Sequence, residues 1–526
     1  MSEVTEVLAT PDAQERAALA GARPALIERF GIRGLYGFRD ISLSSKHAAT
    51  ILIARNGTGK TTLLSALDAF LKLQLYRLRD LDFAEIYCRL RGVPEELVLT
   101  HDDLLTFLQG SSEGEIGRLA SRSQVGTDKL LAFLFSDYEP YLDNWANDHD
   151  QHSITNALYR AFGHDSRAVR KACADAYNSL FRKSPPLDRL RTTLAEALSD
   201  FEIVYLPTYR RVELALTDNR EERRRLGRSK PKLNISASGL HTAEIQFGLG
   251  DISERLSQLH DRIIARSNRE YREISENIID ELIRGYEVSE DAEIPQPDDL
   301  KLFFSRLESG TRMMGPYYSR ISAPDFAKIY SSEGVPPESA KFLRYFLNKL
   351  NGIINITKEI EQPVGDFIRS CNRYLSSSEP STLPSTEANR THLQEIDAKE
   401  LKLNPTDLSV NVESLPAKTP ISLDSLSSGE KQMISLFARM YLYPKKKIVL
   451  IDEPELSLSI DWQRGILIDV LLSPNCEQVV AITHSPFVFD NSLEPFARTL
   501  DLSVSDANQP QLALPTSAGN GDVSDD

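Results

Sequence analysis

The chain has 526 residues, of which 41% are apolar and 26% are charged, a length and balance typical of a globular protein with two or three structural units. No apolar run reaches the roughly 18 residues that a membrane-spanning helix needs, which argues against a membrane protein. The formal net charge of −15 argues against a uniformly basic nucleic-acid-binding protein, although a local basic groove is compatible with it.

Cysteine usage and the N-terminus bear on the cellular compartment. The four cysteines are scattered and form no CxxC pair, which fits a reducing compartment and neither a disulfide framework nor a zinc site. The N-terminus, MSEVTEVLATPDAQERAALA, lacks a basic start followed by an apolar stretch, so no export signal is expected. We therefore expect a cytoplasmic protein.

The first part of the chain predicts strands, a glycine-rich loop and a helix in succession. Residues 1–24 are polar and Ala-rich and indicate a loose arm or a short helix. From Leu26 to Leu43 apolar and polar positions alternate, and a short buried strand follows at residues 50–53. The run TTLLSALDAFLKLQLYRL then has apolar positions at helical spacing. This order within residues 25–80 is what a phosphate-binding loop requires.

The loop, ARNGTGKT at residues 54–61, matches G-x-x-x-x-G-K-[ST] except that Ala54 replaces the first glycine. Alanine can serve there if its backbone stays in a region open to residues with a Cβ. The glycines let backbone N–H groups approach the phosphates, Lys60 places a cation on the β- and γ-phosphates, and Thr61 supplies a hydroxyl to Mg²⁺. The residues predicted to bind the nucleotide here are Asn56, Gly57, Thr58, Gly59, Lys60, Thr61 and Thr62.

Two long stretches separate this loop from the rest of its expected site. Residues 81–200 and 214–400 are predicted to be mainly helical insertions, the second a candidate dimerisation lobe. Between them, residues 201–213 begin with FEIVYL, a buried-strand candidate that returns the chain to the first unit. Polar residues at 376–390 indicate a linker.

Within the second stretch, residues 251–285 predict one long helix, and residues 341–375 predict another. At ~1.5 Å per residue the first helix spans only about 50 Å. We therefore expect a helical lobe or a dimer-contact helix and not a long, isolated coiled-coil arm. The apolar positions that repeat at helical spacing are Ile252, Leu256, Leu259 and Ile263.

Some polar segments have two interpretations. Arg210 and Arg211 follow the predicted strand and either contact phosphate or a partner, or form ordinary surface ion pairs. Residues 220–232, REERRRLGRSKPK, are the most basic of the chain; Arg223, Arg224 and Arg225 there are candidates for nucleic-acid or partner contacts, with a solvated loop as the alternative. The run NDHDQHS at 147–153 is favoured as a solvated loop over a metal site, because nothing completes a ligand set.

The second group of motifs lies in residues 401–505, ahead of a polar tail at 506–526 that we expect to be disordered. The run IVLIDEPE predicts a central strand ending at Asp452, which is positioned to hold Mg²⁺, while Glu453 is positioned to orient and deprotonate the attacking water. His484 follows a further buried strand and is expected to touch the γ-phosphate. An acidic helix cap and a core histidine are the structural alternatives.

The motif LSSGE opens a predicted helix. Ser427 and the N–H groups at the start of this helix are able to bind phosphate oxygens, and a Ser-Ser-Gly run is also a common helix cap. Both interpretations hold together, because a cap with free N–H groups is an anion site. The predicted nucleotide contacts of this motif are Ser427, Ser428, Gly429 and Glu430.

Together, ARNGTGKT, LSSGE, IVLIDEPELSLS and AITHSP resemble the ABC-type ATPase superfamily, with Ser428 at the first glycine of the usual signature. The resemblance implies an α/β, ABC-type P-loop ATPase head assembled from the N- and C-terminal segments, with a large, mainly helical insertion. It implies ATP and Mg as cofactors and two heads that meet head to tail. Ser427 and Gly429 would then act on the nucleotide of the partner head, and residues 456–461 would form the loop that connects the two sites.

A narrower resemblance is to the PtuA-like ATPases of Septu and retron anti-phage systems, relatives of the OLD family. It is carried by the phosphate-loop region, YLPTYRRVE at 205–213, IQFGLGDI at 245–252, FIRSCNRYL at 367–375 and the whole of 423–500. The chain ends soon after His484, so no Toprim nuclease domain is expected. The resemblance implies a cytoplasmic homodimer or higher homo-oligomer that controls a separate, PtuB-like HNH nuclease, with retron RNA or DNA, or phage DNA, as a further partner.

Two other functions compete with this interpretation. An SMC- or RecF-like DNA-repair ATPase predicts hydrolysis stimulated by duplex DNA and no associated nuclease. A nucleotide-gated scaffold predicts ATP binding with little turnover. The residue that packs against adenine has no motif of its own, and Tyr36 and Phe38 are the candidates.

Overall fold

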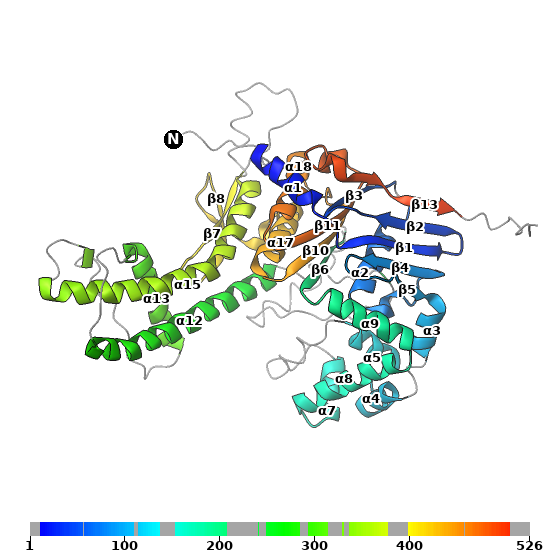
Figure 1. Cartoon of the computed structure of the whole chain (residues 1–526), viewed down its shortest axis with the longest axis horizontal. Helices are drawn as coiled ribbons and strands as arrows, with labels where there is room; N and C mark the ends of the chain where they lie inside the picture. The colour runs from blue at the N-terminus through cyan, green and yellow to red at the C-terminus, as the bar shows by residue number, and fades with distance from the viewer. Residues whose placement is uncertain are drawn as a thin grey trace, which may run out of the picture.

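The computed structural model describes residues 11–55, 57–109, 114–136, 153–207, 240, 249–284, 293–313, 329–330, 336–376, 398–456 and 458–504. These residues form three sheets, one parallel and two antiparallel, and helices cover both faces of the parallel sheet (Figure 1). The expected α/β class is therefore confirmed. None of the helices in these ranges is both long and apolar enough to cross a membrane.

The central sheet is parallel and has the order β12-β3-β11-β10-β6. It interleaves strands from distant parts of the chain, so the head is assembled from N- and C-terminal segments as expected. FEIVYL does return to this sheet, as the outer strand beside β10. The strands are β3 (Ala49–Ile53), β6 (Phe201–Leu206), β10 (Lys446–Asp452), β11 (Cys476–Thr483) and β12 (Ala497–Thr499).

Alternating side chains of β10 enter two different cores. Ile448 and Leu450 belong to the hydrophobic cluster on one face, and Val449 and Ile451 to the cluster on the other. Because both faces are covered, the strand is a continuous apolar run. One face carries α2 (Lys60–Leu71) and η1 (Leu75–Leu78); the other carries α1 (Pro11–Ala22), α17 (Ser428–Leu442) and α18 (Ile460–Leu472).

A second, antiparallel sheet has the order β13-β2-β1-β4-β5 and lies at the right of Figure 1. The expectation that residues 81–200 form a mainly helical insertion is wrong at its start, because β4 and β5 pair in this sheet. Ile86, Tyr87 and Cys88 are all buried, so β4 lacks the alternation of apolar and polar residues that predicts a strand. The strands are β1 (Ile27–Leu35), β2 (Arg39–Ser44), β4 (Glu85–Leu90), β5 (Leu97–Thr100) and β13 (Asp501–Val504).

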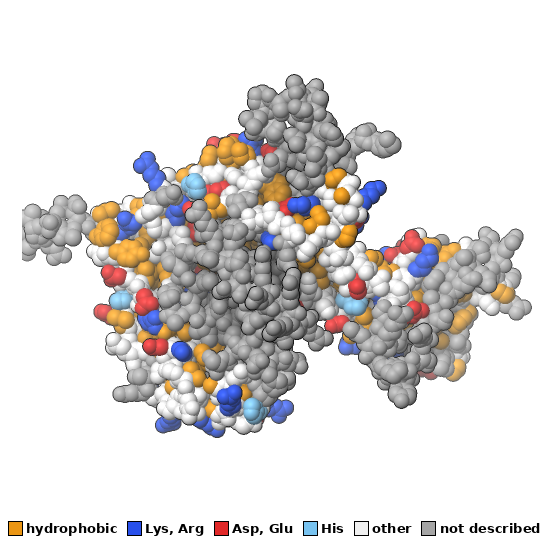
Figure 2. All heavy atoms as spheres, turned by 180° about the vertical axis from the view of Figure 1, so that it is seen from behind, with side chains coloured by type: hydrophobic (Ala, Val, Ile, Leu, Met, Phe, Trp, Pro, Cys, Tyr) orange, Lys and Arg blue, Asp and Glu red, His pale blue; other side chains and the backbone are white. Residues whose placement is uncertain are grey.

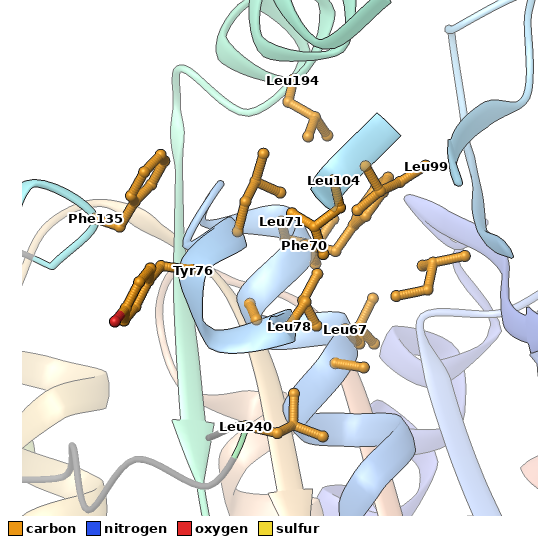
Figure 3. Packing of buried hydrophobic residues seen from close by; sticks show 14 of the residues in the cluster. Leu67, Phe70, Leu71, Tyr76, Leu78, Leu99, Leu104, Phe135, Leu194 and Leu240 are labelled. Carbon is orange, nitrogen blue, oxygen red and sulfur yellow. The ribbon is translucent and has the colours of Figure 1, made fainter. Parts of the chain in front are cut away.

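The helical part of this insertion begins at His101 and packs onto the helix that follows the glycine loop. Figure 3 shows Leu104 and Leu194 of the insertion close to Phe70 and Leu71 of α2. The insertion is therefore continuous with the core of the head. Its described helices are α3 (His101–Gln109), α4 (Glu115–Ser123), α5 (Thr127–Leu134), α7 (Ser153–Ala161), α8 (Ser166–Arg182) and α9 (Pro185–Ala197).

The second helical region projects away from the sheets at the left of Figure 1. It contains α12 (Leu249–Arg284), α13 (Pro297–Met313) and α15 (Pro337–Leu375). The predicted helix at 251–285 is confirmed, and its apolar positions are buried: Ile252, Leu256, Leu259 and Ile263. The helix is not isolated, because α12 and α15 pack together and share an apolar cluster with α13.

A small sheet that the sequence did not predict joins this lobe to the head. It has the antiparallel order β7-β8-β9, with β7 (Lys399–Leu403), β8 (Val410–Ser414) and β9 (Pro420–Ile421). Short 3-10 turns complete the head at Leu423–Ser425, Pro486–Val488 and Glu494–Phe496.

Candidate nucleotide-binding site

The glycine loop connects β3 to α2 and has the conformation that its glycines allow. Gly57 and Gly59 have φ values of 80° and 94°, in the left-handed region that glycine adopts without a Cβ penalty. Ala54 stays outside that region, which explains why alanine is accommodated there. The Oγ1 of Thr58 donates a hydrogen bond to the carbonyl of Arg55 at 2.8 Å. Asn56 lies outside the described residues.

Lys60 begins α2, and its side chain meets the catalytic candidate from the other end of the chain. Its Nζ lies 3.0 Å from Oε1 of Glu453, and the two side chains are only 5% and 17% exposed. A buried cation needs an anionic partner. Glu453 is that partner in this structure.

Thr61 and Asp452 form the second link between the two motifs. The Oγ1 of Thr61 donates to Oδ2 of Asp452 at 2.7 Å, and Asp452 is 1% exposed at the end of β10. A hydroxyl beside a carboxylate is a set of hard oxygen ligands that fits Mg²⁺, which takes its other ligands from water and phosphate. No group of three or more His, Cys, Asp or Glu suited to a metal occurs among the described residues.

Glu453 has a strained backbone. Its φ is 55°, and its N–H donates to the carbonyl of Ile482 at 2.8 Å. A left-handed conformation costs a non-glycine residue about 1–3 kcal/mol. This backbone conformation turns the chain sharply after β10 and directs the carboxylate of Glu453 to Lys60.

His484 follows β11 and is held by a residue that the sequence analysis did not single out. Its Nδ1 lies 2.9 Å from Oε1 of Glu455, and its backbone N–H donates to the same oxygen at 3.0 Å. The distance from Nδ1 to Oε1 of Glu453 is 3.9 Å. The second glutamate of DEPE was the signal available in the sequence, but its inward direction depends on the turn after β10.

The LSSGE motif forms the start of α17. Ser427 is the N-cap: its side chain accepts from the backbone N–H of Glu430, and the Glu430 carboxylate accepts the N–H of Ser427 at 2.6 Å. Nζ of Lys399 donates to the other oxygen of Glu430 at 2.7 Å. The expected helix cap is confirmed. These bonds engage both oxygens of Glu430, whose contact with a nucleotide stays a prediction, as do those of Ser427, Ser428 and Gly429.

The aromatic candidates for the adenine site lie close to the glycine loop in the chain's fold. Tyr36 and Phe38 are 51% and 39% exposed in the β1–β2 turn. The neighbouring Arg39 donates from Nη1 to the carbonyl of Gly57 at 3.1 Å. Arg39 therefore attaches the turn to the glycine loop, and its guanidinium carbon lies 5.3 Å from the centroid of the Phe38 ring.

The remaining candidates fall outside the described residues: Arg210, Arg211, Arg223, Arg224, Arg225 and most of the run at 147–153. Figure 2 shows the molecule from behind relative to Figure 1. Positive and negative side chains are interspersed over the described surface in this view, which has no extended basic field. Their proposed contacts with nucleic acid or a partner remain predictions.

The interleaved sheet, the glycine loop and the Thr61–Asp452 and Lys60–Glu453 pairs define a P-loop ATPase head. A family model described as "AAA domain, putative AbiEii toxin, Type IV TA system" matches residues 50–490. This range covers most of the chain and every motif from Lys60 to His484. The chain belongs to that family.

Comparison with solved structures gives a weak similarity to the crystal structure of the Smc head domain with an extended coiled coil bound to the C-terminal domain of ScpA, derived from Pyrococcus furiosus. The identity is 12%, the TM-score is 0.30, and the match covers 91% of this chain and 96% of that chain. A similarity of this size supports no conclusion about function. No curated protein matches the chain.

Proposed function

We propose that this protein binds and hydrolyses ATP as a homodimer, and that its nucleotide state controls a separate HNH nuclease in anti-phage defence. The observation that carries the ATPase proposal is the meeting of Lys60 with Glu453 and of Thr61 with Asp452. Four residues with the chemistry of phosphoryl transfer come together from the two ends of the chain.

The geometry suggests how binding prepares the site. The phosphates of ATP would displace Glu453 as the partner of Lys60, since they carry more negative charge. Glu453 is then released to accept a proton from a water molecule that attacks the γ-phosphorus in line, giving ADP and phosphate. Mg²⁺, held by Thr61 and Asp452, would neutralise charge on the β- and γ-phosphates.

The nucleoside would lie against the β1–β2 turn. Tyr36 has a φ of 56° and Gly37 one of 80°, so the turn holds its aromatic side chains outward beside the glycine loop. A flat, exposed ring suits stacking against a purine. Arg39, through its hydrogen bond to the carbonyl of Gly57, would keep the stacking ring, that of Tyr36 or Phe38, at a fixed distance from the phosphates.

The position of the signature supports the proposed dimer. None of the hydrogen bonds described for Ser427 or Glu430 reaches the glycine loop of the same chain. We therefore assign Ser427 and Gly429 to the nucleotide of a second copy, with residues 456–461 between the two sites.

The defence role is supported by the resemblance to PtuA-like ATPases and by the family description, which names a putative toxin of a toxin–antitoxin system. The lobe of α12, α13 and α15 offers a surface apart from the head for an HNH nuclease, with retron RNA or DNA, or phage DNA, as a further partner. Co-expression with a PtuB-like HNH nuclease, followed by purification of a complex and phage challenge, tests this part.

The ATPase part is tested with two variants of the full chain. We expect Lys60→Ala to abolish ATP binding, and Glu453→Gln to keep binding while losing about 10²- to 10⁴-fold in turnover, the usual contribution of a general base. Fluorescent-nucleotide binding and phosphate release measure the two effects. Tight binding with negligible phosphate release, unchanged in Glu453→Gln, would instead identify a nucleotide-gated scaffold.

A further inference from the structure

Glu455 is a buried carboxylate next to the candidate catalytic residues. It is 6% exposed, and its Oε1 receives both the backbone N–H and Nδ1 of His484, at 3.0 and 2.9 Å. Its Oε2 is buried and has no hydrogen-bond partner among the described residues. This carboxylate therefore accepts all of its described side-chain hydrogen bonds from one histidine.

A structural task alone explains this carboxylate poorly. Removing an ionised carboxylate from water costs several kcal/mol unless it is paired. A neutral glutamine at the same place would accept the backbone N–H of His484 equally well. The negative charge at Glu455 therefore acts on the imidazole ring.

The hydrogen bond fixes the ring chemically as well as spatially. An ionised carboxylate only accepts hydrogen bonds, so Nδ1 of His484 carries the proton in this contact. The other ring nitrogen, Nε2, is then the atom left for the nucleotide, and the ring is 48% exposed. A ring that donates from both nitrogens to Glu455 and to a phosphate is a cation, and the adjacent carboxylate stabilises that form.

A glutamine on α18 fixes the two loops that carry these residues. Nε2 of Gln463 donates to the carbonyls of Glu455 and Leu458 at 3.3 and 3.0 Å. Its Oε1 accepts from Oγ of Ser485 at 2.8 Å. The loop after β10 and the loop after β11 are thereby joined to one side chain.

We propose that Glu455 is a positioning residue of this ATPase: it holds His484 with Nδ1 protonated and Nε2 directed at the γ-phosphate, and its charge supports the cationic ring during hydrolysis. The inference rests on the proposed ATPase function. It assigns a task to Glu455, the second glutamate of DEPE, which has no role of its own in the P-loop chemistry.

The test compares Glu455→Gln, His484→Ala and the double variant in the full-length chain. We expect Glu455→Gln to keep KM and ATP affinity and to lower kcat about 10- to 100-fold, as when the carboxylate behind a metal-bound histidine is lost. The double variant should be no slower than His484→Ala, because residues that act as one unit are not additive. Glu455→Asp, which retains the charge, should recover part of kcat.

The matched control is Glu477→Gln on β11, which also removes a paired carboxylate, here the partner of Arg91; its kcat should equal that of the wild type. The proposal is overturned if Glu455→Gln has wild-type kcat, if the losses multiply in the double variant, or if Glu455→Asp is slower than Glu455→Gln. A wild-type chain that does not hydrolyse ATP overturns the proposed function itself, and thermal unfolding identifies any variant that fails to fold.

Discussion

At the scale of single residues, the site depends on backbone conformations that few side chains tolerate. Glu453 holds a left-handed φ at the end of β10, and Gly59 holds one at the start of α2. The first directs a carboxylate to Lys60, and the second is the position at which we propose that the loop opens for phosphate. Only the glutamate stores backbone strain, since glycine adopts a positive φ without a Cβ penalty.

The variant Gly59→Ala tests whether the glycine loop needs a residue that adopts a left-handed φ. An added Cβ would lie 3.3 Å from Cδ1 of Ile41 at a φ of 94°, so we expect a loss of about 1–2 kcal/mol in the free energy of unfolding together with weaker ATP binding. Gly352→Ala is the control: its Cβ meets open space inside α15, and it should stabilise the protein by about 0.5–1 kcal/mol. Equal effects of the two variants in urea unfolding would contradict this account.

At the scale of elements, β7 connects the helical lobe with the signature. Lys399 at one end binds Glu430. In the middle, Asn372 of α15 exchanges two hydrogen bonds with the backbone of Leu401. At the far end, buried Arg306 of α13 donates to the carbonyl of Pro405 and pairs with a glutamate of α15. A path of hydrogen bonds and ion pairs thus links the lobe to the start of α17.

Lys399→Met tests the signature end of this path. The pair with Glu430 is mostly buried, so we expect a loss of about 1 kcal/mol in unfolding free energy and slower ATP hydrolysis at unchanged ATP affinity. Lys399→Arg should restore both. Lys402→Met, which removes an exposed lysine of the same strand, should leave hydrolysis unaltered; if it slows hydrolysis as much as Lys399→Met, the path through Glu430 is not responsible.

Lys447, at the start of β10, makes the free energy of unfolding depend on pH. Burial lowers the pKa of Lys447 from 10.5 to about 8, although its Nζ donates to the carbonyls of Tyr443 and Lys445. Between these pH values the unfolded chain binds more protons than the folded one. The contribution of Lys447 to the free energy of unfolding therefore rises with pH, by up to about 1.4 kcal/mol per unit.

Lys447→Met should remove this contribution. We expect the variant to gain stability relative to the wild type below about pH 8 and to lose that advantage as the pH rises toward 10.5. Urea unfolding across the window measures the difference, with the exposed Lys446→Met as the control. Parallel stability curves for Lys447→Met and the wild type would show that Lys447 does not titrate there.

At the scale of the whole molecule, the proposed dimer places each signature over the other chain's nucleotide. Lys60→Ala and Gly429→Asp should each be inactive alone. Mixing them should restore hydrolysis, because the glycine loop of the second variant and the signature of the first then form one complete site. Sedimentation with ATP should show dimers for Glu453→Gln. Absence of complementation while mixed dimers form would place the signature in its own chain's site.

The sequence predicted the parts whose evidence is local. The strands beside the motifs, the helix predicted over 251–285 and the cap at Ser427 follow from short-range periodicity and spacing, and the structure confirms them. It did not reveal β4, where consecutive buried residues hide the alternation, the four-residue strand β5 or the small sheet of β7. Glu455 and Gln463 were also missed, because their partners are distant in sequence and become neighbours only through the turns after β10 and β11.

The residues by themselves determined which chemistry this protein has available: a lysine and a hydroxyl after a glycine loop, and two carboxylates after an apolar strand. Only the tertiary structure decided that these groups meet. In the central sheet β3 lies between β12 and β11, and β10 lies on the other side of β11, so the loops after β3 and β10 come together. Strand order is set by burying apolar faces contributed by distant segments, a non-local balance that no short pattern encodes.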